Sequence, residues 1–258
     1  RHDISIPDYE YVLSHAPNSY TEYATMRLAA FSYKQKDYLS AVKYYSELEK
    51  VTADPARKAE SQLALMRSYY QLKDYANTIL YSEIVLKDLS IKDELKAEAH
   101  LVAGISYLQN GDYANANTHL KKTIALVKNK MWAEARYNVA LILYMQEEHK
   151  KCEKEIFDYV KVKPNYDYWL AKAYILLGDN YLALGDPAQA KATLKSIIDN
   201  YKAEDDIVTT AQEKYDKIIE QENMQNNRRM LEDSLKITPG INEDEMNKVL
   251  NENEHDNK

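Results

Sequence analysis

A short turn signal recurs along this chain at nearly constant spacing, and that recurrence constrains the fold more than any other feature. Each copy has three residues, usually with Asp in the middle, and stands before an apolar helical pattern. The copies begin at Lys36, Lys73, Gly111, Glu147 and Gly185, at spacings of 37, 38, 36 and 38 residues. A single globular core has no reason to keep such a period, which is typical of a stacked array of repeated units.

Each turn signal separates two helical patterns that carry small residues at fixed offsets. The pattern before it holds a small or apolar pair, namely Leu28-Ala29, Leu65-Met66, Ala103-Gly104, Val139-Ala140 and Leu177-Gly178. The pattern after it holds, three residues on, Ala41, Thr78, Ala116, Cys152 and Ala190. Small residues at a crossing let two helix backbones approach closely, so the sequence predicts antiparallel helix pairs.

Composition favours helix throughout and argues against several classes of partner. The 258 residues include only five Gly and six Pro, and no stretch alternates apolar and polar residues long enough to predict a strand. The net charge of −7 comes from interspersed acids and bases, so we expect no nucleic-acid partner. No run of eighteen apolar residues predicts a membrane span.

The sequence shows no pattern that predicts catalysis. The metalloprotease, phosphate-loop, dinucleotide-binding and serine-hydrolase motifs are missing, and the six histidines show no pair at the spacing of metal ligands on a helix. Cys152 is the only cysteine and stands at a small-residue position, where burial would raise its pKa and leave it inert. We therefore expect a protein that is not an enzyme and that has no cofactor and no metal site.

The repeated positions resemble the tetratricopeptide repeat family over about residues 20–201. That family has a small residue in the first helix, an aromatic three residues on, Gly-Asp-Tyr at the turn, and then Ala and a bulky residue. The third and fifth copies match closely, at Gly104, Tyr107, Gly111, Tyr113, Ala116 and Leu120 and at Gly178, Tyr181, Gly185, Ala190 and Leu194. The second and fourth depart from it, at Met66, Thr78, Leu143, His149 and Cys152. The resemblance implies an all-α, right-handed α-solenoid of antiparallel helix pairs, the tetratricopeptide superhelix, with a long C-terminal capping helix.

We divide the chain accordingly into four segments. Residues 1–19 are the end of a preceding repeat or an N-terminal extension, and residues 20–201 form five helix pairs. Residues 202–236 form the capping helix, and residues 237–258 form an acidic, mobile tail. The chain starts at Arg1 without an initiating Met, which indicates that an upstream segment is missing.

The resemblance also implies where a partner binds. In the family the first helix of each pair lines a concave surface, which we call the first-helix face. Its residues here include Leu101, Ile105 and Leu108, and the partner-binding residues are expected to be Met26, Tyr33, Arg67, Tyr70, Tyr137, Tyr144, Met145 and Asp179. This face would be apolar and aromatic, with Arg67 and Asp179 as its few charges. Alternatively, several of these residues are buried between neighbouring first helices.

We therefore expect a scaffold that binds a protein or peptide. Segments such as HAPNSYTEYATMRLAAFSY and LKSIIDNY are similar to repeats of bacterial cell-envelope tetratricopeptide proteins, which implies a periplasmic or outer-membrane-associated assembly component; a cytoplasmic location is the alternative. Two further hypotheses are a carbohydrate-binding module that uses Tyr platforms, and self-association through the polar C-terminal helix or an exposed terminal repeat.

Overall fold

The computed structural model describes residues 6–88, 91–163 and 166–237, and within these ranges the chain is helical without a strand. It divides into two compact units, Arg1–Leu170 and Ala171–Lys258, each taken by itself below. The division falls inside α10 (Asp167–Ala183), whereas the sequence places its segment boundary at residue 201. Every described helix is too short or too polar to cross a bilayer.

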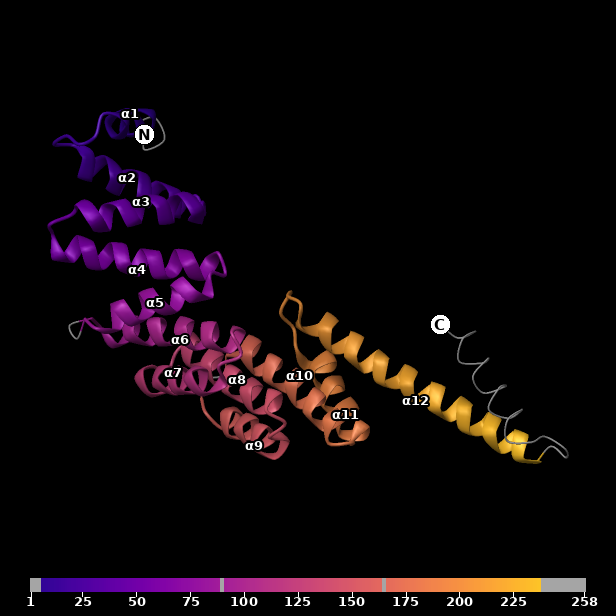
Figure 1. The fold of residues 1–258 in the computed structure, drawn as a ribbon. Helices are drawn as coiled ribbons and strands as arrows, with labels where there is room; N and C mark the ends of the chain where they lie inside the picture. The colour runs from indigo at the N-terminus through magenta and orange to yellow at the C-terminus, as the bar shows by residue number, and fades with distance from the viewer. Residues whose placement is uncertain (1–5, 89–90, 164–165, 238–258) are drawn as a thin grey trace. The chain divides into compact units, whose positions relative to one another are not determined.

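The first unit is a stack of helices in which neighbours in sequence are neighbours in space (Figure 1). Its helices are α1 (Ile6–Ser14), α2 (Thr21–Lys34), α3 (Tyr38–Val51), α4 (Pro55–Gln71), α5 (Tyr75–Leu86), α6 (Asp93–Gln109), α7 (Tyr113–Leu126), α8 (Lys130–Met145) and α9 (His149–Val160). The pairs α2 with α3, α4 with α5, α6 with α7 and α8 with α9 pack together, and α3, α5 and α7 also contact the next first helix. The predicted fold class, an α-solenoid of helix pairs, is confirmed.

The turns inside the helix pairs share two features, a residue with positive φ and, in most of them, an Asp that caps the second helix. The residue before the helix cap has positive φ, at Lys36 (62°), Lys73 (59°), Gly111 (78°), Glu147 (59°) and Gly185 (76°). In four of the five turns the Asp that follows accepts a hydrogen bond from a backbone N–H of the second helix, as Asp112 does from Asn115 at 3.0 Å. This cap satisfies a donor that the helix start would otherwise leave unpaired, which explains why Asp recurs.

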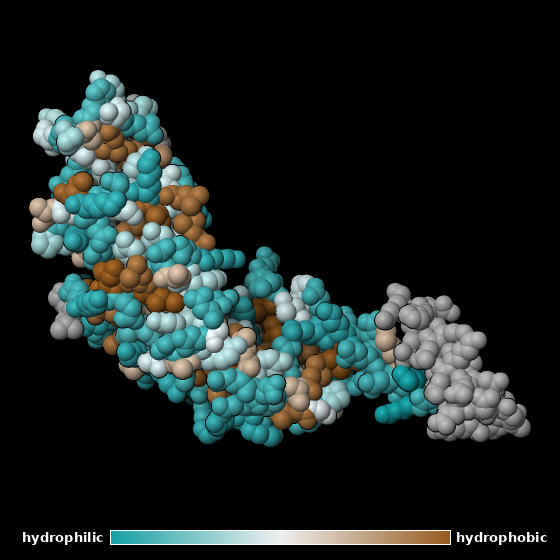
Figure 2. Space-filling view, in the orientation of Figure 1, coloured by the Kyte–Doolittle hydropathy of each residue, from teal (hydrophilic) through white to brown (hydrophobic). Residues whose placement is uncertain are grey.

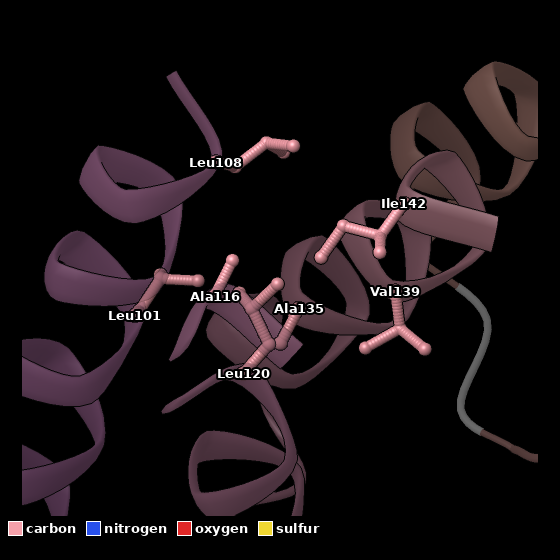
Figure 3. Packing of buried hydrophobic residues seen from close by; sticks show 7 residues of the cluster. All are labelled: Leu101, Leu108, Ala116, Leu120, Ala135, Val139 and Ile142. Atoms are coloured by element: carbon pink, nitrogen blue, oxygen red, sulfur yellow. The ribbon is translucent and has the colours of Figure 1, made fainter. Parts of the chain in front are cut away.

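The predicted helix crossing in the third pair is closely packed. A Cβ added at Gly104 would lie 2.8 Å from Cγ of Leu120 and 3.2 Å from the carbonyl oxygen of Ala116. Ala116 and Leu120 are fully buried, and Tyr113 packs against the same cluster. Figure 3 shows this cluster continuing from α6 and α7 to Ala135, Val139 and Ile142 of α8. The core therefore runs from one pair to the next.

The connections between pairs are short. α3 ends at Val51 and α4 begins at Pro55, where Asp54 caps the new helix by accepting from the N–H of Ala56 at 3.0 Å. α7 ends at Leu126 and α8 begins at Lys130. Proline suits the first position of a helix because its missing N–H would have no partner there.

The second unit contains most of α10 (Asp167–Ala183), all of α11 (Pro187–Asn200) and α12 (Ile207–Ile237). The Cβ position of Gly178 lies 3.1 Å from Cγ of Leu194, which repeats the crossing between α6 and α7, and Ala190 is fully buried. The first half of α12 packs on α11 through buried residues that include Ile207 and Ile218. In its second half, residues 223–230 are exposed. The predicted tail lies outside the described residues from 238 onward.

Candidate partner-binding face

The first-helix face of the first unit begins with an aromatic group on α2. Tyr33 meets Tyr38 and Tyr45 edge to face, with ring centroids 5.7 and 6.5 Å apart, and Met26 packs on the same cluster. Burial raises the pKa of Tyr33, so this phenol stays neutral at physiological pH. Tyr33 thus fixes the turn of its pair while keeping part of its ring accessible.

Arg67, which the sequence predicts as a partner-binding charge, is already paired within the protein. Its Nε and Nη2 each donate to a carboxylate oxygen of Glu98 at 2.6 Å, so α4 is joined to α6 by a bidentate ion pair. The side chain of Arg67 is 36% exposed and that of Glu98 is 24% exposed. A bidentate pair of this kind is strong and directional. The face therefore presents a neutral pair here instead of a free cation.

Tyr70 lies one helical turn beyond Arg67 on α4 and packs on the cluster of Met66, Val85 and Val102. Burial, with a smaller contribution from the carboxylate of Glu134 on α8, raises the pKa of Tyr70 to about 12. The side chain of Tyr70 therefore packs where α4, α5 and α6 meet. Its body fills space between first helices, and only part of the ring is left to contact a partner.

The remaining predicted residues of the first unit lie on α8. Tyr137 contacts the ring of Trp169 at 5.5 Å, and Tyr144 meets the ring of His149 edge to face at 5.7 Å. Met145 at the end of α8 is 48% exposed, which makes it the most accessible of the predicted apolar contacts. The sequence does not predict the contact between Trp169 and Tyr137, because Trp169 belongs to α10, beyond the fourth pair.

Asp179 belongs to the second unit and is also paired. Lys214 of α12 donates to both of its carboxylate oxygens, at 2.8 and 3.0 Å. The sequence predicts two charges on the first-helix face, Arg67 and Asp179. Each is thus paired with a residue of another helix, Arg67 with Glu98 of α6 and Asp179 with Lys214 of α12. The sequence does not identify these partners because they lie 31 and 35 residues away.

Two of the other residues assigned to the first-helix face are core residues. Leu101 and Leu108 of α6 are 5% exposed. The alternative of burial between first helices therefore holds for these positions. In the part of Figure 2 that shows α2 to α9, apolar residues form separate brown patches among polar ones. Contact with a partner would thus rest on a few separate anchors.

The described residues hold no cluster of three or more His, Cys, Asp or Glu arranged for a metal ion. Cys152 is buried, and burial raises its pKa to about 12, as expected for an inert thiol. The histidines are less scattered than the sequence indicates, because α6 and α7 bring His100 and His119 together with Nδ1 atoms 3.1 Å apart. Their spacing of nineteen residues matches no motif, so only the packing of the helices reveals the pair.

Comparisons with known proteins agree with this architecture. Two family models, both described as tetratricopeptide repeat, match residues 101–161 and 167–203. Among curated proteins, none matches this sequence.

Solved structures share the fold at low sequence identity. A tetratricopeptide repeat protein from Parabacteroides merdae superposes with a TM-score of 0.61 at 15% identity, over 97% of this chain and 91% of that one. The MamA protein gives 0.55 at 22% identity over 79% and 96% of the two chains. The apo form of RapI gives 0.55 at 15% identity over 86% and 92%. Together, the repeated helix pairs, their shared turn and crossing geometry and the two family matches identify residues 101–161 and 167–203 as tetratricopeptide repeats.

Proposed function

We propose that this protein is a non-enzymatic scaffold that binds an extended or helical segment of a partner protein on the first-helix face of its first unit. Tetratricopeptide repeat proteins generally mediate protein–protein interactions. The observation that carries the finer proposal is the row of half-buried tyrosines, Tyr33, Tyr70, Tyr137 and Tyr144, one or two on each of α2, α4 and α8. Such rings are held by their own packing, so they lose little conformational freedom on binding.

The pairing of Arg67 with Glu98 bears on which contacts would give a partner its affinity. Since the central cation of the face is already neutralised, affinity would come from apolar and aromatic anchors, a few of which dominate. Raising the salt concentration from 50 to 500 mM should then change the dissociation constant by less than about threefold, because salt screens exposed charges and not apolar contacts.

A matched pair of substitutions tests the face. Met145→Asp places a charge among the proposed anchors, and Leu80→Asp places the same charge on α5, a second helix, at a residue of similar exposure, 53%. Peptides selected from a displayed library on the wild-type protein serve as ligands, and titration calorimetry gives their affinities. Met145→Asp should weaken binding by about tenfold or more, the effect of losing one anchor. Equal effects of the two substitutions would refute the proposed location.

The other hypotheses gain less support. A carbohydrate-binding site would need free carboxylates among the aromatic rings, whereas Asp179 and Glu98 are both engaged in ion pairs. Self-association and a periplasmic or outer-membrane-associated location stay predictions from the sequence.

A further inference from the structure

His100 of α6 and His119 of α7 meet inside the third helix pair, and Glu83 of α5 completes a three-helix chain of polar groups. Nδ1 of His100 lies 3.1 Å from Nδ1 of His119, and Nε2 of His119 lies 3.3 Å from a carboxylate oxygen of Glu83. His119 is 8% exposed, and its ring also contacts Tyr107 at 5.4 Å.

This arrangement fixes the proton on each ring. An ionised carboxylate can only accept, so the N–H of neutral His119 belongs on Nε2, towards Glu83. Nδ1 of His119 is then the acceptor, and His100 must carry its proton on Nδ1 to donate to it. With one proton on each ring, both contacts are satisfied.

One added proton can be accommodated, because neutral His100 can carry its proton on Nε2 and accept at Nδ1 from the Nδ1–H of protonated His119. When both rings are protonated, each carries an Nδ1–H, so that two donors and two positive charges oppose each other across 3.1 Å. We propose that His100, His119 and Glu83 form an acid-sensitive latch that holds α5, α6 and α7 together near neutral pH and releases α7 from α6 on acidification.

The surrounding groups favour the neutral rings. Burial, with smaller contributions from the neighbouring His119 and Lys122 of α7, lowers the pKa of His100 to about 4. Burial also lowers the pKa of His119; Glu83 of α5 opposes this and Lys122 adds to it. The ring of Tyr107 on α6 also contacts His119, and burial raises the pKa of this phenol, so it stays neutral between pH 4 and 7.5.

The direction of the pH effect follows from linkage. Histidines in the unfolded chain take up protons near pH 6.5, whereas the folded rings resist protonation until the pH is lower. The latch therefore stabilises the fold fully above pH 6.5 and loses its effect as the pH falls towards 4. For each histidine the folding equilibrium constant should fall by up to about tenfold per pH unit in that window.

Two measurements test the latch, and the first uses the unmodified protein. With ring-¹⁵N-labelled histidine, NMR should find His100 as the Nδ1–H tautomer and His119 as the Nε2–H tautomer at pH 7.5, with both rings titrating below pH 6.5. Titration of either ring at pH 6.5 or above, or the opposite tautomers, would overturn the proposal whatever happens to any variant.

The second measurement compares urea unfolding at pH 7.5 and 5.0. His100→Asn keeps a side-chain amide where Nδ1 stood, and since an amide can donate or accept and takes up no proton between pH 7.5 and 5.0, it cannot oppose protonated His119 with a second charged donor. From pH 7.5 to pH 5.0 the folding equilibrium constant should fall in both proteins. The fall in the wild type should be at least about tenfold larger than the fall in His100→Asn. His15→Gln, at an exposed histidine of the same unit, should behave as the wild type. Equal losses in all three proteins would contradict the latch.

Discussion

At the scale of single residues, the turn inside each helix pair demands a backbone conformation that glycine adopts most readily. Lys73 holds it with φ of 59°. Since the left-handed region costs a non-glycine residue about 1–2 kcal/mol, Lys73→Gly should raise the free energy of unfolding by up to about 1 kcal/mol after the entropy of glycine is counted. Lys58→Gly, in the exposed first turns of α4, should lower it by about 1 kcal/mol. Urea unfolding measures both, and a loss of stability in Lys73→Gly would contradict the strain argument.

Gly104 is a glycine for a different reason, which is the space left by its neighbours. The Cβ of Gly104→Ala would meet Cγ of Leu120 at 2.8 Å and a backbone oxygen at 3.2 Å. Overpacking of this kind costs about 1–3 kcal/mol, which should exceed the gain of up to about 1 kcal/mol from the helix propensity of alanine. Gly178→Ala meets Leu194 at 3.1 Å and should cost less. If Gly104→Ala unfolds at the same or a higher urea concentration than the wild type, the crossing is looser than described.

At the scale of helices, neighbouring first helices are joined by polar pairs as well as by the core. Arg67 and Glu98 connect α4 and α6, so a double-mutant cycle with Arg67→Met and Glu98→Gln should give a coupling free energy of about 1 kcal/mol, between the values for exposed and buried pairs. Thermal or urea unfolding of the four proteins supplies the cycle. The exposed pair of Lys154 and Asp158 within α9 is the comparison and should show no measurable coupling. A cycle that closes to zero for Arg67 and Glu98 would mean that the two helices are held by apolar contacts alone.

The helix pairs could be predicted from the sequence because their causes are local. An Asp cap, a residue with positive φ and a small residue at the crossing all lie within a dozen positions of one another and recur in most copies, although Glu148 replaces the Asp in the fourth. The candidate site could not be predicted to the same degree, because its character depends on contacts between helices. Arg67 reads as a free charge until α6 places Glu98 beside it, and His100 and His119 read as isolated until α6 and α7 are packed. Whether Leu101 and Leu108 line a surface or fill a core depends on how closely the first helices approach, which the sequence pattern leaves open.

At the scale of the whole molecule, a repeat array should transmit a local defect only to its neighbours. Each helix pair is stabilised by itself and by the pairs next to it, so damage weakens with distance along the stack. The two halves of α12 allow a matched test, because Ile218 is 3% exposed against α11 whereas Met230 is 72% exposed.

Ile218→Asp should destabilise the second unit by about 3 kcal/mol or more, since it removes apolar burial and leaves a carboxylate without water. Hydrogen exchange followed by mass spectrometry should show faster exchange in α10, α11 and the first half of α12, with α2 to α5 unchanged. Met230→Asp should alter none of these segments. Faster exchange throughout α2 to α5 in Ile218→Asp would mean that the chain unfolds as one cooperative body, and nearest-neighbour coupling would then be the wrong description of its stability.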